Sequence, residues 1–157
     1  METIIKDISD AFNANRDRIL NGEYGLLLGR CFSTFTVLEE EQGKKVITLM
    51  YNDGIAETMP KQAQHVDVFI LDAGASLGEH FHEHATAEIT VLFGRGTAHV
   101  GPFRLKIGPA SEVLFQSSVI HDVRNKSPET MVFISLQDNP IIQADGKIDY
   151  CPVLRAV

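Results

Sequence analysis

The sequence has no tryptophan, only two cysteines, and no apolar run that approaches the length of a membrane-spanning helix. Such a helix needs about 20 apolar residues, so no helical membrane span is predicted. Cys31 and Cys151 lie far apart and no CxxC pair occurs, so a disulfide framework is not expected. The first residues include an early acid and no long apolar core, which is unlike a secretory signal. We therefore expect a cytoplasmic protein with reduced cysteines.

Basic residues are also scarce. The chain holds 14 Lys and Arg against 21 Asp and Glu, which gives a formal net charge of −7. A negatively charged protein is repelled by a nucleic-acid backbone and by an anionic membrane surface. The composition therefore predicts no nucleic-acid partner and no membrane partner, and it leaves a small molecule as the expected ligand.

What is present is an ordinary globular composition and a change of pattern near residue 22. Hydrophobic residues make up 44% of the 157 positions, which fits one domain over residues 1–157. Ile4, Ile8 and Phe12 recur at four-residue steps, so residues 1–22 are predicted to be a helical extension. After it come about ten short strand-like runs punctuated by Gly and Pro. That rhythm favours a mainly β sandwich or barrel.

Three of the six histidines lie within five residues, at His80, His82 and His84. In an extended segment, residues two apart point to the same side, so these imidazoles share a face. Neutral imidazole is the commonest metal ligand in proteins. Glu88 lies close by, and His121 occurs in a strand-like segment further along the chain. The spacing is compatible with a metal site and also with a polar loop.

The context of these histidines resembles the first motif of the cupin superfamily. In that motif five residues separate a glycine from the first histidine, and one residue separates the first histidine from a second. A glutamate and a glycine come later. Gly74, His80 and His82 keep the spacing, within a motif that spans residues 74–96. The second motif resembles residues 116–125, in which His121 and Asn125 are retained.

The sequence departs from the cupin pattern at two places. Five residues separate His82 from Glu88, one more than the family usually has. Pairing His82 with His84 instead restores that spacing but loses the spacing from Gly74. In the second motif, Gln116 stands where the family has proline. The spacing leaves both registers of the histidine pair open, and His82 is common to the two.

The resemblance implies a cupin-type double-stranded β-helix, which is a jelly-roll barrel, with its core over residues 66–137 and with an N-terminal helix. It also implies a single-domain monocupin that forms a homodimer, since exposed sheet edges need cover. One divalent metal ion is implied, and a set without thiolate suits Fe, Mn, Ni, Zn or Cu. The implied ligands are His80, His82, Glu88 and His121, with His84 as the alternative.

A metal held by protein ligands with open positions is what a catalytic site needs. The resemblance therefore implies an enzyme that acts on a small organic molecule in the barrel, first a metal-dependent oxidoreductase of the dioxygenase type. A non-catalytic ligand-binding or metal-binding module, and a cupin isomerase or lyase, are the alternatives. Gln116 and His99 are candidate polar contacts to the substrate, and Phe133 is a candidate apolar contact.

Overall fold

The computed structural model describes residues 2–52, 65–139, 141 and 147–154. The chain begins with α1 (Glu2–Leu20) and a short 3-10 helix, η1 (Tyr24–Leu27). The strands follow in this order: β1 (Phe32–Glu41), β2 (Lys44–Tyr51), β3 (His65–Leu71), β4 (His80–Phe81), β5 (Ala87–Phe93), β6 (Gly96–Val100), β7 (Phe103–Ile107), β8 (Glu112–Phe115), β9 (His121–Arg124), β10 (Met131–Gln137) and β11 (Cys151–Pro152). In this part of the chain, no helix is long and apolar enough to cross a membrane.

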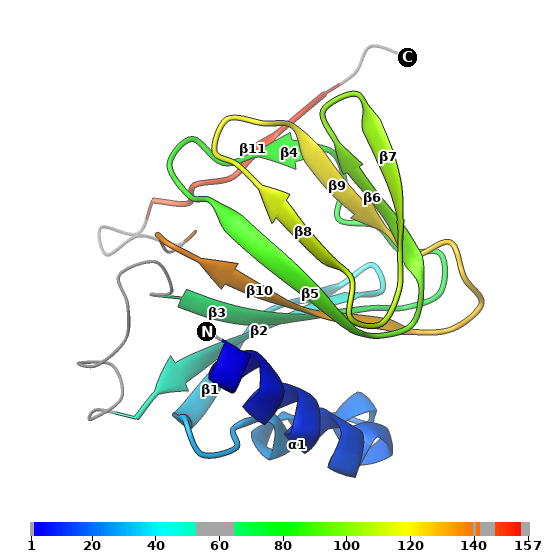
Figure 1. The fold of residues 1–157 in the computed structure, drawn as a ribbon. Helices are drawn as coiled ribbons and strands as arrows, with labels where there is room; N and C mark the ends of the chain where they lie inside the picture. The colour runs from blue at the N-terminus through cyan, green and yellow to red at the C-terminus, as the bar shows by residue number, and fades with distance from the viewer. Residues whose placement is uncertain (1, 53–64, 140, 142–146, 155–157) are drawn as a thin grey trace.

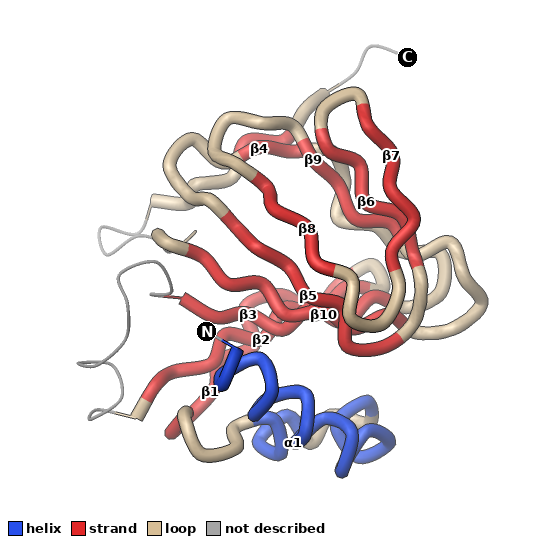
Figure 2. The backbone as a smooth tube through the Cα atoms, viewed as in Figure 1, coloured by secondary structure: helices blue, strands red, loops and turns tan. Residues whose placement is uncertain are grey.

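The strands form two antiparallel sheets. The larger sheet has the order β1-β2-β3-β10-β5-β8, and the smaller has the order β11-β4-β9-β6-β7. Each sheet also joins strands from distant parts of the sequence, such as β3 with β10 and β4 with β9, as their different colours show (Figure 1). Figure 2 shows that strands dominate both layers and that helix is confined to the N-terminal end. The predicted mainly β class, with a jelly-roll barrel and an N-terminal helix, is confirmed.

One face of the larger sheet is apolar because it packs against α1. On β3, Val66, Val68 and Ile70 belong to an apolar cluster that includes Ile8 and Phe12 of α1. The helix lies under this face of the sheet (Figure 1). The four-residue spacing of its apolar positions places them on one side, as the sequence predicted. The helix thereby seals the outer face of the sheet.

The opposite face of the larger sheet points into the barrel. Side chains alternate along a strand, so the neighbours of the helix-facing residues point the other way. Phe69 on β3 and Phe133 on β10 stack there with ring centroids 4.8 Å apart. At the turn between β5 and β6, Gly94 has a φ of +81°, and a Cβ there would lie 2.4 Å from the Thr130 carbonyl oxygen. Glycine thus lets the strands turn tightly under the barrel.

Candidate metal centre

Three histidines meet on the inner face of the smaller sheet. His80 lies on β4 and His121 lies on β9, and the two residues are direct cross-strand partners. His82 comes directly after β4, two residues beyond His80, so it faces the same way as His80. All three side chains are buried, with 4% of His80, 4% of His82 and 3% of His121 exposed. Antiparallel pairing therefore joins two stretches that lie about 40 positions apart in the sequence.

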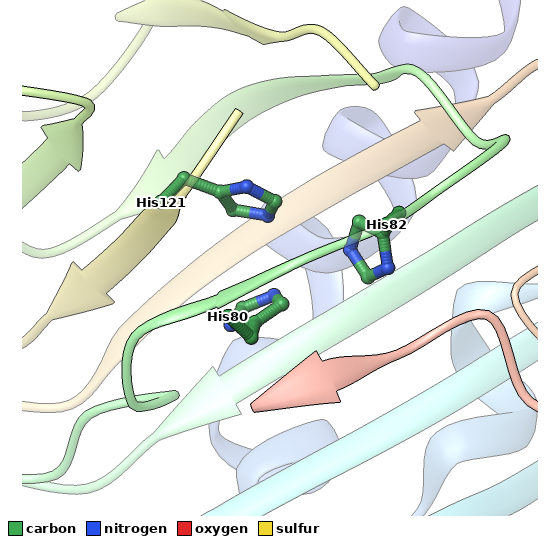
Figure 3. Close-up of side chains that lie close together, drawn as sticks. All are labelled: His80, His82 and His121. Carbon is green, nitrogen blue, oxygen red and sulfur yellow. The ribbon is translucent and has the colours of Figure 1, made fainter. Parts of the chain in front are cut away.

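The three rings converge on one point. One ring nitrogen of each histidine lies within 4.8 Å of the other two. The centroid of the His80 ring lies 4.3 Å from that of His121 and 5.0 Å from that of His82. Figure 3 shows the rings around a common space. A metal ion bonds imidazole nitrogen at about 2.0–2.1 Å, so one ion reaches all three after small ring rotations.

Backbone carbonyls fix the tautomer of each ring. Nδ1 of His80 bonds the Gly78 carbonyl at 2.7 Å, and Nδ1 of His121 bonds the Val119 carbonyl at 3.0 Å. Nδ1 of His82 bonds the carbonyl of Asp149. A carbonyl only accepts, so in each pair Nδ1 carries the proton and donates it. The lone pair is then on Nε2, which is the arrangement that metal-binding histidines commonly have.

Burial also keeps two of these rings, His80 and His121, neutral. Desolvation, and then the nearby His121 ring, lower the pKa of His80 from 6.5 to about 3. Desolvation lowers the pKa of His121 to about 4, although its bond to the Val119 carbonyl opposes the shift. Both rings are therefore uncharged at neutral pH, and uncharged imidazole is the form that binds metal. The three histidines fit one divalent ion by tautomer and position.

The C-terminal part of the described chain packs against the histidine-bearing strand β4 and the loop that follows it. β11 pairs with β4, and Tyr150 stacks on the His80 ring with centroids 4.6 Å apart. The carboxylate of Asp149 accepts hydrogen bonds from the backbone N–H groups of Glu83, His84 and Ala85. Burial alone would raise the pKa of Asp149, but these bonds lower it below its usual value. Asp149 thus holds the loop after His82 while its own carbonyl orients His82.

No sequence pattern indicates the roles of Asp149 and Tyr150, because a lone acid beside apolar residues carries no distinctive spacing. Only the fold shows that this segment returns to β4. An extended segment of this kind adds hydrogen-bonding groups to a site without a recognisable motif.

Replacing Asp149 with alanine is expected to lower both stability and metal affinity. Three backbone N–H groups lose their acceptor, which costs about 1–3 kcal/mol of unfolding free energy for each one left without water. Loosening the segment that orients His82 is expected to weaken metal binding about 10-fold or more. Urea unfolding and metal titration measure the two effects.

Asp138 offers a matched control for this variant. Its carboxylate accepts a hydrogen bond from the Thr86 backbone N–H in the same loop, 2.8 Å away, but it contacts none of the three histidines. Asp138→Ala is expected to lower stability while leaving metal affinity unchanged. Equal metal affinity in Asp149→Ala and in the unmodified protein would show that Asp149 does not position His82.

Two residues predicted as metal ligands lie away from the three histidines. Glu88 is exposed, because it occupies the outward position on β5 between Ala87 and Ile89, which line the cavity. With one extra residue between His82 and Glu88, the Glu88 side chain points to the face of the strand opposite the cavity. His84 is exposed in the loop after β4, with Nε2 3.9 Å from the Glu83 carboxylate. Glu88 and His84, which the resemblance implied as ligands, are thus not brought together with the three histidines.

Of the three residues predicted to contact the substrate, one lines the cavity and two do not. Phe133 lines the cavity, as expected. Gln116 is exposed immediately after β8, where Phe115 takes the inward position. His99 pairs with Asp122 across β6 and β9 and lies on the side opposite the core residue Ala98. Gln116 and His99 are therefore not among the residues that line the cavity.

A cavity of about 440 Å³ adjoins the three histidines. Its walls include a group of aromatic rings, namely Phe69, Phe115 and Phe133. Ile148 and Tyr150 of the C-terminal segment line it as well. The larger sheet also contributes polar side chains to the lining, namely Lys44, His65, Asp67 and Ser135. A mostly apolar cavity with a few polar groups is typical of a small-molecule site.

Comparison with known families agrees with this arrangement. The family described as Cupin domain matches residues 67–137, which include β3 to β10 and all three histidines. This chain belongs to the cupin superfamily. A search of curated proteins found no match to the cupin chain.

Solved cupin structures share its fold at low sequence identity. CapF, a capsular polysaccharide assembling protein from Staphylococcus aureus, is 15% identical with a TM-score of 0.61. The match covers 77% of this chain but only 33% of CapF, so this chain spans about a third of that protein. A predicted oxalate decarboxylase from Thermotoga maritima is 21% identical with a TM-score of 0.52, over 66% of this chain and 90% of that one. A cupin-2 domain protein from Rhodospirillum rubrum is 18% identical with a TM-score of 0.58, over 77% and 75% of the two chains.

Proposed function

We propose that this cupin binds one divalent metal ion through His80, His82 and His121 and acts on a small organic molecule in the adjoining cavity. The observation that carries the proposal is the convergence of three buried imidazoles, each of which donates from Nδ1 to a backbone carbonyl. Three protein ligands leave coordination positions open, and open positions are a property of catalytic rather than structural sites. When bound, the metal supplies Lewis acidity to a substrate oxygen.

The protein's own groups hold the substrate and limit its contact with water. Phe69, Phe115 and Phe133 provide flat apolar surface for a carbon skeleton. Tyr150 and Ile148 line the cavity from the C-terminal segment and cover the side next to His80. An apolar wall beside charged groups strengthens the electrostatic interactions between them. The substrate is therefore bound with its oxygen-bearing end towards the three imidazoles.

Oxidoreductase chemistry of the dioxygenase type is the first candidate. Nitrogen ligands without thiolate suit iron, manganese, nickel and copper as well as zinc, and the redox-active ions among these support oxygen chemistry. The bound ion is therefore one of these five elements.

Isomerase or lyase chemistry is the second candidate, and one pair of residues favours it. Nε2 of His65 lies 3.4 Å from Oδ1 of Asp67, and both residues line the cavity. A histidine beside a carboxylate can accept and return a proton, which an isomerase or lyase requires. The similar structure from Thermotoga maritima is described as a predicted oxalate decarboxylase, and a decarboxylase is a lyase.

A comparison of two readouts tests these candidates. The protein is loaded separately with Fe(II), Mn(II), Ni(II), Zn(II) and Cu(II), and the bound metal is measured by elemental analysis. Dioxygen uptake is followed with diketones, thiols and hydroxyaromatic acids, and exchange of carbon-bound hydrogen in D₂O is followed by NMR with hydroxyketones. Uptake supports the oxidoreductase, whereas exchange without uptake supports the isomerase or lyase. Bound metal with neither reaction would indicate a binding module, and a protein that retains no ion would overturn the proposal.

A further inference from the structure

A second polar cluster lies inside the barrel on the larger sheet. Asp67 on β3 is 1% exposed, yet it lines the cavity. One carboxylate oxygen accepts a hydrogen bond from the Thr48 hydroxyl on β2 at 2.6 Å. The other accepts one from the Gln137 amide on β10 at 2.9 Å. Three neighbouring strands therefore supply side chains that hold one buried negative charge.

The register of the sheet shows how unusual this cluster is for its surroundings. Thr48, Asp67 and Ser135 are direct cross-strand partners and form one row of the inner face. The next row on the same face is apolar and consists of Val46, Phe69, Phe133 and Val91. Packing of the barrel does not require a polar row, since the adjacent row fills the same layer with apolar side chains. Burying a carboxylate is costly, so the row indicates a task beyond core packing.

The hydrogen bonds within this cluster are incomplete. A carboxylate only accepts, so the Gln137 amide must turn its nitrogen towards Asp67. The same nitrogen lies 3.1 Å from Oγ of Ser135 and donates to it. Gln137 Oε1 is buried and, among the described residues, has no hydrogen-bond partner. Because Ser135 Oγ acts as the acceptor for Gln137, the Ser135 hydroxyl still has a hydrogen to donate.

From this geometry, we infer that Asp67 and Ser135 form a hydroxyl-binding subsite opposite the three histidines. A ligand hydroxyl group donates to the Asp67 carboxylate and accepts from the Ser135 hydroxyl, so both groups are used. The substrate is then a small hydroxylated molecule that carries a metal-binding oxygen group, such as a carboxylate or a ketone, at its other end. This inference rests on the proposed metal site, because that site anchors the other end.

The charges around the subsite select a neutral donor. An anionic group would be repelled by the Asp67 carboxylate, and an apolar group would leave the carboxylate and Ser135 without partners. A second cation is disfavoured because Lys44 lines the same cavity and His65 already lies 3.4 Å from Asp67. A hydroxyl group adds no charge and matches one donor and one acceptor.

Matched chelators test the subsite without knowledge of the natural substrate. The probes are alkyl hydroxamates and ω-hydroxyalkyl hydroxamates with chains of two to six carbons, titrated by calorimetry into the Zn(II)-loaded protein. The hydroxamate binds the metal, and members of a pair differ only at the chain end. At the chain length that spans the cavity, the hydroxylated probe is expected to bind about 10-fold more tightly than its partner.

Two variants assign that preference to the subsite. Ser135→Ala and Asp67→Asn are each expected to reduce it to less than about 2-fold, while metal content and the affinity for the alkyl hydroxamates stay unchanged. Glu88→Gln, at an exposed position on β5, is the control and is expected to keep the full preference. Ser135→Ala removes a single oxygen atom, so it carries the test if Asp67→Asn does not fold.

The possible failures are distinguishable. Equal affinities for both probe series at every chain length, with normal metal content, would overturn the hydroxyl subsite and leave the metal proposal standing. A preference that survives both variants would also overturn the assignment to Asp67 and Ser135. Loss of metal binding and of all hydroxamate binding in the unmodified protein would overturn the metal site and, with it, the anchored ligand.

Discussion

Replacement of His82 with alanine is expected to lower metal content from about one ion per chain to less than a tenth of that value. The reason is that His82 supplies one of only three converging nitrogens, and two imidazoles from β4 and β9 hold an ion far more weakly. Loss of a residue that merely orients a ligand costs about 10–100-fold in affinity, so loss of a ligand is expected to cost at least that much. Elemental analysis after dialysis measures the change.

Two neighbouring residues serve as matched controls for this variant. His84 has the same side chain two positions later but is exposed, and Glu88 is exposed on β5. His84→Ala and Glu88→Gln are expected to retain the metal content and the melting temperature of the unmodified protein. If His84→Ala lost the metal while His80→Ala kept it, the site would use the other register of the histidine pair.

Acidification is expected to destabilise the metal-free protein through two of these rings, His80 and His121. His80 has a folded pKa of about 3 against 6.5 when unfolded, so between these values the unfolded chain binds more protons. Stability therefore falls as the pH drops below about 6.5, and the contribution of His80 is fully lost only below its folded pKa. Each pH unit of this window costs about 1.4 kcal/mol, which gives roughly 3 kcal/mol between pH 7 and pH 4.

His121 acts in the same direction, since burial lowers its pKa to about 4. The unfolding free energy is measured with urea from pH 7 to pH 4 in the presence of a chelator. A variant with His80→Gln and His121→Gln lacks both rings and is expected to show a much shallower dependence on pH. Parallel curves for the two proteins would mean that other groups cause the acid sensitivity.

The sequence predicted most of the fold because its signals are local. The spacing of Ile4, Ile8 and Phe12 marks the helix, and Gly and Pro mark the ends of the strands. Histidines two positions apart on an extended segment also share a face in the structure, and the resemblance to cupins brought in His121 from a distant strand. These parts of the prediction depend on periodicity, which the backbone imposes directly.

The remaining parts of the site depend on which face of a strand each side chain occupies. They also depend on pairing between segments that are far apart in the sequence. Glu88 and Gln116 are near the histidines in sequence, but each occupies the outward position of its strand or lies beyond it. A shift of one residue moves a side chain to the opposite face, and spacing alone does not reveal such a shift. The contacts of Asp149 and the row through Asp67 depend on pairing between strands that are far apart in sequence.

The pairing of β11 with β4 has a consequence for the order in which the site is assembled. During synthesis, the segments that carry His80, His82 and His121 leave the ribosome well before Asp149 and Tyr150 do. An ion that reaches the nascent chain early therefore meets imidazoles of which one, His82, still has no carbonyl to fix its proton. The proposed metal site therefore gains the carbonyl that orients His82 only when β11 docks on β4.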